Sequence, residues 1–208
     1  MEDFELTLFD RISVIQEMNK KYDLENNSYI AFSGGKDSTI LHYLVDIALP
    51  NNKIPRLYIN TGIEYIDMVK YVLELQKNDD RIIIVRPSKS IKSVLEEYGY
   101  PMKSKEHSVK LGQYQRGFKN PSNIEYRDGV QLDKNYNIIY DKNGKVKRPL
   151  AECPKLLKYQ FFDKNFTLKV SDKCCLKLKK EPSKKWAKEN NRTINLTGLR
   201  SSEGGAKA

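Results

Sequence analysis

Apolar residues recur along the first 22 residues at the spacing of an amphipathic helix. Four residues carry this repeat: Leu8, Ile12, Ile15 and Met18. Their intervals of three or four positions place them on one face of a helix, and the positions between them are mostly polar. We therefore expect a helix from Phe4 to Tyr22.

Short apolar runs and amphipathic segments alternate after this first helix. Strands are expected at residues 29–32, 54–60, 81–85 and 193–197. Helices are expected at residues 39–49, 65–77, 90–98, 103–118 and 155–162. Strict alternation of strand and helix is typical of a parallel sheet with helices on both faces. We therefore predict an α/β fold with a doubly wound, mostly parallel sheet, on which ligands bind at the carboxyl ends of the strands.

The middle of the second half breaks this alternation. Residues 121–149 are interpreted as β-rich, and the pair Asn143-Gly144 inside residues 137–146 predicts a hairpin with a type I′ turn. We treat the chain as a single nucleotide-binding domain that carries a β-hairpin insertion at residues 119–150.

Composition narrows the class of protein. The chain has 208 residues, of which 39% are hydrophobic and 10% aromatic, enough to fill a core, so wholesale disorder is excluded. No apolar run approaches the roughly 20 residues that span a bilayer, and the acidic start lacks the layout of a signal peptide. Three cysteines do not make a disulfide framework. We expect a cytoplasmic protein without membrane association.

Charge is distributed unevenly along the chain. Residues 1–100 carry 12 basic and 16 acidic side chains, whereas residues 101–208 carry 25 and 11, a net charge of −4 against +14. For any single lysine, a solvated surface is an equally good explanation. The excess of basic over acidic side chains in the whole second half of the chain indicates a partner that carries phosphates, either a nucleotide or a nucleic acid or both.

The segment Ser33-Gly34-Gly35-Lys36-Asp37-Ser38 lies between an expected strand and an expected helix. Glycines allow a tight turn that brings amide N–H groups toward an anion, and the following helix offers its own free N–H groups. Serine hydroxyls and a lysine add further donors. The spacing matches neither a Walker A loop nor the dinucleotide Gly-x-Gly-x-x-Gly pattern. An ordinary turn that caps a helix is the simpler alternative, but six such residues in this position favour a phosphate-binding loop.

This segment resembles the pyrophosphate-binding loop of the adenine nucleotide α-hydrolase superfamily, which includes ATP pyrophosphatases, tRNA-thiolating enzymes and sulfonucleotide reductases. Three further segments resemble the branch that reduces phosphoadenosine phosphosulfate (PAPS) or adenosine phosphosulfate (APS). They are Asn60-Thr61-Gly62-Ile63-Glu64, where Asn60 replaces the usual Asp, Cys174-Cys175 with the basic residues and Pro182 that follow, and Thr197-Gly198-Leu199-Arg200. The resemblance covers nearly the whole chain outside the insertion and implies a Rossmann-like fold.

The resemblance also implies roles for these residues. Ser33, Gly34, Gly35, Lys36, Asp37 and Ser38 would hold the phosphate or sulfate end of an adenine nucleotide, which is PAPS, APS or ATP. The adenosine would contact the next strand end, at Asn60, Thr61, Gly62 and Glu64. Arg200 would neutralise the charge at the far end of the substrate.

The sequence offers only part of the ligand sets that an iron–sulfur cluster or a Mg²⁺ site would need. Cys174 and Cys175 resemble ligands of an iron–sulfur cluster, but a cubane needs four thiolates and Cys153 is the only other cysteine. We therefore expect the cluster to be absent or incomplete in these residues. In a full-length form, two structural thiols and an intact cluster are equally good expectations. Asp37 is either a carboxylate that caps the helix or a ligand of Mg²⁺ in an ATP-cleaving relative. Of the two histidines, His42 is expected to be packed in the core, and His107 lies in a basic stretch where it could contact phosphate.

The end of the chain departs from the reductase pattern. Reductases of this family continue to a Cys-x-x-Cys pair and a nucleophilic cysteine near the C-terminus, whereas this sequence stops at Ala208. We therefore expect either that the C-terminal tail is missing because the chain is clipped, which the abrupt end favours, or that the chain is a divergent relative that never carried the tail. We assign no catalytic residue.

Three functions follow from the resemblance. The first is an enzyme of the PAPS reductase family in sulfur metabolism or sulfur transfer, with a thioredoxin-like reductant or a cysteine desulfurase as partner. The second is an ATP pyrophosphatase that adenylates tRNA or DNA before thiolation. The third is a non-catalytic subunit that binds a nucleotide or a nucleic acid. A homo-oligomer is compatible with each of them.

Overall fold

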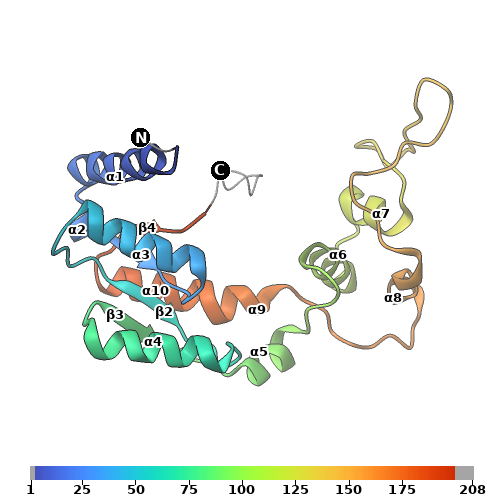
Figure 1. Cartoon of the computed structure of the whole chain (residues 1–208). Coiled ribbons are helices and arrows are strands. Elements are labelled where there is room, and N and C mark those ends of the chain that lie inside the picture. The colour runs from blue at the N-terminus through green and yellow to red at the C-terminus, as the bar shows by residue number, and fades with distance from the viewer. Residues whose placement is uncertain (1–2, 200–208) are drawn as a thin grey trace. The chain divides into compact units, whose positions relative to one another are not determined.

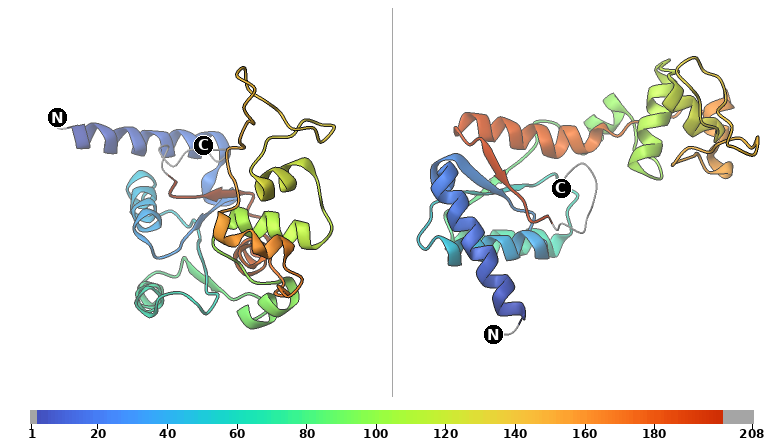
Figure 2. Two further views of the ribbon diagram at one scale, coloured as in Figure 1. Left: turned by 90° about the vertical axis from the view of Figure 1, so that its right-hand side faces the viewer. Right: turned by 90° about the horizontal axis from the view of Figure 1, so that it is seen from above.

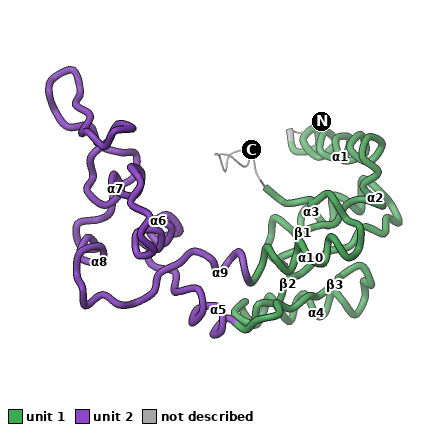
Figure 3. The backbone as a smooth tube through the Cα atoms, turned by 180° about the vertical axis from the view of Figure 1, so that it is seen from behind, with its two compact units in different colours: residues 1–90, 178–208 green, residues 91–177 purple. Residues whose placement is uncertain are grey.

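The structure, a computed structural model, describes residues 3–199 (Figure 1). The chain divides into two compact units: unit 1 comprises residues 1–90 and 178–208, and unit 2 comprises residues 91–177 (Figure 3). Each unit has its own cluster of buried apolar side chains, so the two are described in turn. Residues 119–150, expected as an insertion, lie within unit 2.

Unit 1 is built on one parallel sheet. Its strands are β1 (Ser28–Ala31), β2 (Arg56–Ile59), β3 (Ile82–Val85) and β4 (Ile194–Leu196). They are hydrogen-bonded in the order β3-β2-β1-β4, with Ile30 opposite both Arg56 and Leu196. The chain moves from β1 outward to β3 and then returns to the other side of β1. Strand order therefore reverses between β1 and β4, where doubly wound sheets bind their ligands.

Helices cover both faces of this sheet. They are α1 (Asp3–Tyr22), α3 (Lys36–Ala48) and α4 (Ile66–Asn78) on one face and α10 (Glu181–Glu189) on the other, with the short α2 (Leu24–Asn27) before β1. Figure 2, right, shows α10 in orange-red on one side of the strands and α3 and α4, in cyan to teal, on the other.

Alternating side chains along the strands form the two apolar layers. Tyr29 packs against Ala187 of α10, whereas its neighbour Ile30 packs against Val45 of α3. Phe32 continues the second layer, against Val72 of α4. This arrangement confirms the predicted doubly wound α/β fold. The helices and strands expected in this unit are present, with ends shifted by a few residues.

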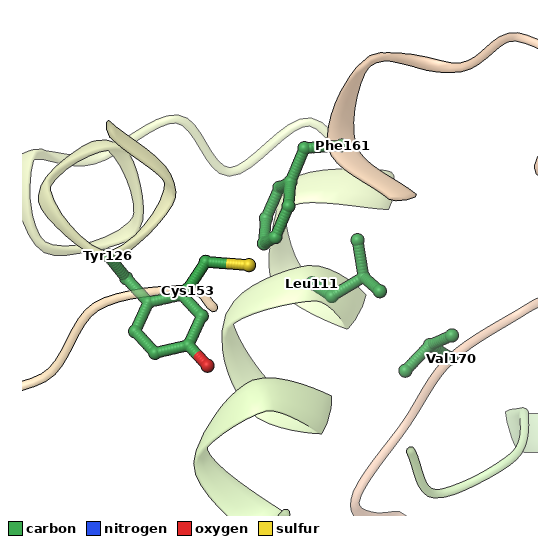
Figure 4. Close-up of a cluster of buried hydrophobic side chains, with 5 residues drawn as sticks. All are labelled: Leu111, Tyr126, Cys153, Phe161 and Val170. Carbon is green, nitrogen blue, oxygen red and sulfur yellow. The ribbon is translucent and has the colours of Figure 1, made fainter. Parts of the chain in front are cut away.

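Unit 2 is mostly helical. Its elements are α5 (Ile91–Tyr98), α6 (Lys105–Gln115), α7 (Pro121–Asp128), the 3₁₀ turn η1 (Lys155–Leu157), α8 (Tyr159–Phe162) and α9 (Lys173–Cys175). A π-helical segment, η2 (Leu176–Lys180), follows α9 and leads into α10. The core brings together Leu111, Tyr126, Cys153, Phe161 and Val170 (Figure 4).

The prediction of a β-rich segment over residues 121–149 is wrong for its first part, which forms α7. The Asn120 side chain accepts a hydrogen bond from the Asn123 N–H at 3.0 Å, Pro121 stands in the first turn, and Gly129 ends the helix with a φ of +77°. These are ordinary start and stop signals of a helix. They outweigh the weak apolar repeat of an eight-residue segment.

The hairpin at residues 137–146 is present only as isolated antiparallel bridges, which pair Leu132 with Ile138 and Tyr140 with Val146. Its turn is not of type I′, because Gly144 has a φ of +73° but Asn143 does not lie in the left-handed region. The carboxylate of Asp141 accepts the N–H groups of Asn143 and Lys145, at 2.8 and 2.9 Å. This carboxylate stabilises a turn with a single left-handed residue.

No helix among residues 3–199 is both long enough and apolar enough to cross a membrane.

Candidate functional site

The segment Ser33–Ser38 forms a closed loop between β1 and α3. The Ser33 and Ser38 hydroxyls lie 3.0 Å apart, and the Ser38 hydroxyl accepts the Ser33 N–H at 3.2 Å. Ser38 also donates to the carbonyl of Gly35 at 2.9 Å. Ser38 is buried and Ser33 is exposed. Ser38 therefore fixes the loop from inside, and Ser33 is the serine that remains open to a ligand.

The two glycines of the loop serve different purposes. Gly34 has a φ of +75°, and a Cβ there would lie 3.0 Å from Cγ2 of Val72. Gly35 has a φ of −79° and precedes the first residue of α3 with no side chain capping the helix. The N–H groups of the first turn of α3 are therefore available to an anion, as they are in phosphate sites at helix N-termini. Lys36 is exposed beside them.

Asp37 is half-buried in the first turn of α3. Its carboxylate has no hydrogen-bond or salt-bridge partner within residues 3–199, so the expectation that it caps the helix is not met there. The segment after β4 lies directly against it, since a Cβ on Gly198 would come within 2.5 Å of the Asp37 carbonyl oxygen. The predicted Thr197-Gly198-Leu199 segment thus meets the loop at the point of strand reversal. Arg200 lies outside the described residues.

Glu64 organises the turn that follows β2. Its carboxylate accepts the Thr61 N–H at 3.0 Å, the Thr61 hydroxyl at 2.7 Å and the Gly62 N–H at 3.1 Å. The Asn60 side chain also accepts the Gly62 N–H, at 3.0 Å. Burial acts to raise the pKa of Glu64, but the hydrogen bonds from Thr61 and the nearby Lys179 ammonium, 3.7 Å away, hold it below its usual value. The turn is therefore fixed by an ionised carboxylate.

A cleft of about 920 Å³ lies beside these segments in unit 1. Sheet residues Tyr29, Ala31, Leu57 and Ile59 line it from one side. Ser33 and Glu64 line it at the carboxyl edge of the sheet, so two of the residues predicted from the sequence face the same space. The opposite side includes Ser183 and Ala187 of α10 and carries five cations: Lys179, Lys180, Lys184, Lys188 and Arg192.

Sequence reasoning missed these five cations as part of the site, because it did not predict α10. The available signal was the recurrence of lysine at every fourth position from 180 to 188.

The cysteines do not assemble into a metal centre. Cys153 is buried in the core of unit 2, where burial raises the pKa of its thiol (Figure 4). Cys174 and Cys175 instead line a cavity of about 310 Å³ together with Lys103, Lys105 and neighbouring residues. Across residues 3–199, no three His, Cys, Asp or Glu side chains are grouped so that they could hold a metal ion. These side chains do not fit a cubane cluster, which needs four thiolates.

Both histidines are structural. His42 is buried and accepts a hydrogen bond from Arg56 Nε at 3.1 Å, which confirms the expectation that it is packed. The expectation that His107 could contact phosphate is wrong. Its ring is fully buried and pairs with the Tyr126 hydroxyl at 3.1 Å and with Gln160 Oε1 at 2.7 Å. The charge of neighbouring residues in the sequence did not reveal this packing.

Comparison with known proteins bears on one part of the chain. The family model of the phosphoadenosine phosphosulfate reductase domain matches residues 27–121, which include the Ser33–Ser38 loop and the Asn60–Glu64 turn. An uncharacterized protein of Methanocaldococcus jannaschii is 29% identical over 112 residues, which amount to 50% of this chain and 27% of that protein. The chain thus spans about a quarter of the length of this relative.

Proposed function

With residues 27–121 identified as a phosphoadenosine phosphosulfate reductase domain, a member of the adenine nucleotide α-hydrolase superfamily, we propose that this chain binds an adenine nucleotide through the Ser33–Ser38 loop. The observation that carries the proposal is the uncapped N-terminus of α3 behind a glycine turn, at the carboxyl edge of β1. Free N–H groups, the positive end of the helix and the exposed Lys36 would stabilise a phosphate or sulfate group there.

The donor set favours a sulfonucleotide, PAPS or APS, as the substrate. Cleavage of ATP to release pyrophosphate needs Mg²⁺ held by carboxylates. Asp37 is the only acidic residue of the loop, and Asn60 stands where the family usually has a second carboxylate. Glu64 is already engaged by three donors of its own turn. One free carboxylate is a weak Mg²⁺ site, whereas a sulfonucleotide carries a phosphosulfate bond in place of the phosphoanhydride, so its reaction releases no pyrophosphate and has no need of a Mg²⁺ site for that group.

An ATP pyrophosphatase that adenylates a nucleic acid is the second candidate, because five cations line the cleft opposite the sheet. The two candidates differ in what happens to ATP. We expect PAPS or APS to bind without Mg²⁺ and ATP to release little pyrophosphate even with Mg²⁺. Steady pyrophosphate release that tRNA or DNA stimulates, and that Asp37→Ala abolishes, would establish the second candidate instead.

Nucleotide binding is tested by thermal unfolding. A ligand at a hundred times its dissociation constant stabilises the fold by roughly 2.7 kcal/mol, which raises the melting temperature by several degrees. Gly35→Val should abolish this shift, because the new side chain would stand where the backbone must approach phosphate. The φ of −79° tolerates valine, so the variant should fold, which circular dichroism can verify.

Lys36→Gln offers a milder test with a matched control. It removes an exposed charge of the Ser33–Ser38 loop. Lys53→Gln removes a likewise exposed charge from the segment that precedes β2, at the opposite edge of the sheet. We expect the first variant to weaken the shift and the second to leave it unchanged. An undiminished shift in both Gly35→Val and Lys36→Gln would mean that the nucleotide binds elsewhere.

A further inference from the structure

Three lysines form a regular row along α10 and the residue before it. Lys180, Lys184 and Lys188 recur at every fourth position, are exposed, and line the cleft of unit 1. None of the three has an acidic partner among the residues that the structure describes. Other lysines of the same segment do, since Lys179 pairs with Glu64 and Lys185 with Glu189. The row is therefore an uncompensated line of positive charge on one wall of the cleft.

The row leads away from the phosphate-binding loop. At its start, Lys179 meets Glu64 beyond the carboxyl end of β2. Past its end, the Arg192 guanidinium donates to the carbonyl of Ser28, the first residue of β1, at 3.2 Å. Eight helical residues span about 12 Å, so the cations run from one edge of the sheet toward the other. A nucleotide whose phosphates occupy Ser33–Ser38 would leave the far end of the row without an anion.

The wall opposite the row is apolar. Tyr29, Ala31, Leu57 and Ile59 line it from the sheet. Tyr29 and Leu57 are buried against Ala187 of α10, so the half-buried Ala31 and Ile59 are the apolar side chains that a ligand can reach. A ligand that fills this cleft must therefore combine regularly spaced negative charges along one side with flat apolar groups along the other. Single-stranded nucleic acid has both, because its bases are not enclosed by a second strand. A duplex would offer only its phosphates, since its bases are stacked inside.

We propose that the cleft beneath α10 binds single-stranded nucleic acid, with successive phosphates at Lys180, Lys184 and Lys188 and bases against the sheet wall. This site goes beyond the nucleotide site at the loop and rests on the lysine row, which is not part of the loop, although Ser33 and Glu64 line the same cleft. The spacing of the lysines, about 6 Å along the helix, is comparable to that of phosphates in an extended strand.

Fluorescence anisotropy with a labelled oligothymidylate tests the proposal. The triple variant Lys180→Gln/Lys184→Gln/Lys188→Gln should bind it at least tenfold more weakly than the parent. The slope of log K against log salt should fall in magnitude by about 2, since each phosphate contact on a single strand contributes about 0.7. Glutamine preserves helix propensity, so the fold of α10 should be retained.

A matched control removes the same charge elsewhere. Lys53→Gln/Lys77→Gln/Lys185→Gln changes three exposed lysines that do not line the cleft and should bind the oligonucleotide like the parent. Equal losses in both triple variants would overturn the site in favour of non-specific attraction. Duplex DNA of the same length that binds as tightly as the single strand would overturn it as well.

The nucleotide-induced melting shift separates this proposal from the previous one. A row variant that keeps the shift and loses the oligonucleotide supports the strand site. A row variant that loses the melting shift but still binds the oligonucleotide would show that the lysines belong to the nucleotide site, and this result would overturn the strand site. Row-dependent oligonucleotide binding in a parent protein that shows no shift supports the strand site and refutes only nucleotide binding at the loop.

Discussion

At the scale of single residues, Glu64 shows how one buried carboxylate can fix the turn that follows a strand. Three hydrogen bonds converge on it, and its side chain is only 8% exposed. Hydrogen bonds to a charged group contribute about 1.5–3 kcal/mol each when a partner is removed. Its folded-state pKa lies below the usual value, so its contribution to stability is fully present above the ordinary pKa of glutamate, about 4.3.

We expect Glu64→Gln to lower the free energy of unfolding by about 1–2 kcal/mol at pH 7, because a neutral amide weakens the charge-assisted hydrogen bonds from the backbone and can no longer accept the Thr61 hydroxyl with its second polar atom. The difference from the parent should shrink as the pH falls below the ordinary glutamate pKa, where the parent loses this contribution too. Urea unfolding at pH 7 and pH 3.5 measures both effects. Glu74→Gln, on the exposed surface of α4, is the control and should change stability by less than about 0.5 kcal/mol. A pH-independent difference would contradict the assigned role.

At the scale of elements, a buried polar network joins α3 to the start of β2. The Arg56 side chain is fully buried and donates to His42 Nδ1, to Asn52 and to Asp46 Oδ1, the last at 2.6 Å. Burial lowers the pKa of Arg56 to about 10, but the guanidinium remains charged at neutral pH. Arg81 reaches the same Asp46 carboxylate at 2.7 Å. Asp46 therefore compensates two cations at the edge of the sheet opposite the loop.

Asp46→Asn should destabilise unit 1 strongly, because it leaves the buried Arg56 without its counter-charge. Removing one partner of a buried pair costs about 3–5 kcal/mol. The Asp46 side chain is 30% exposed, so about 2–3 kcal/mol is expected. Asp10→Asn breaks an exposed ion pair with Arg11 by the same chemical change and should cost less than about 0.5 kcal/mol. Urea midpoints followed by the fluorescence of Trp186 give the comparison, and similar costs in both variants would contradict a buried role for Asp46.

The helices and strands also differ in how far the sequence alone could predict them. The strands and the longer helices of unit 1 up to residue 90 follow from apolar periodicity, because each packs one face on a shared core. The four-residue α2 was not predicted. By contrast, α10 presents little more than Trp186 and Ala187 to the sheet, and its lysines conceal any apolar repeat. For α7 the capping residues Asn120 and Gly129 carried the signal instead. The Ser33–Ser38 loop could be located from its residues, but the basic wall of the cleft depends on the return of the chain to β4.

At the scale of the whole molecule, the division into two units predicts that each unit has its own unfolding transition and its own free energy of unfolding. Unit 2 has its own apolar core around Leu111. The buried apolar clusters of unit 1 contain no residue of unit 2. The single tryptophan of the chain, Trp186, lies in unit 1 at 5.7 Å from the Tyr29 ring. Its fluorescence therefore reports the unfolding of unit 1, whereas circular dichroism follows the helices of both units.

Leu111→Ala should lower the stability of unit 2 by about 2–5 kcal/mol, because the side chain is fully buried and leaves a cavity. We expect an early transition by circular dichroism with an unchanged Trp186 midpoint. Val45→Ala, at an equally buried position of α3, is the matched control and should lower the Trp186 midpoint. A nucleotide bound at Ser33–Ser38 should raise the Trp186 midpoint and leave the early transition of Leu111→Ala in place. Transitions that coincide by both probes in every variant would show instead that the two units unfold as one cooperative body.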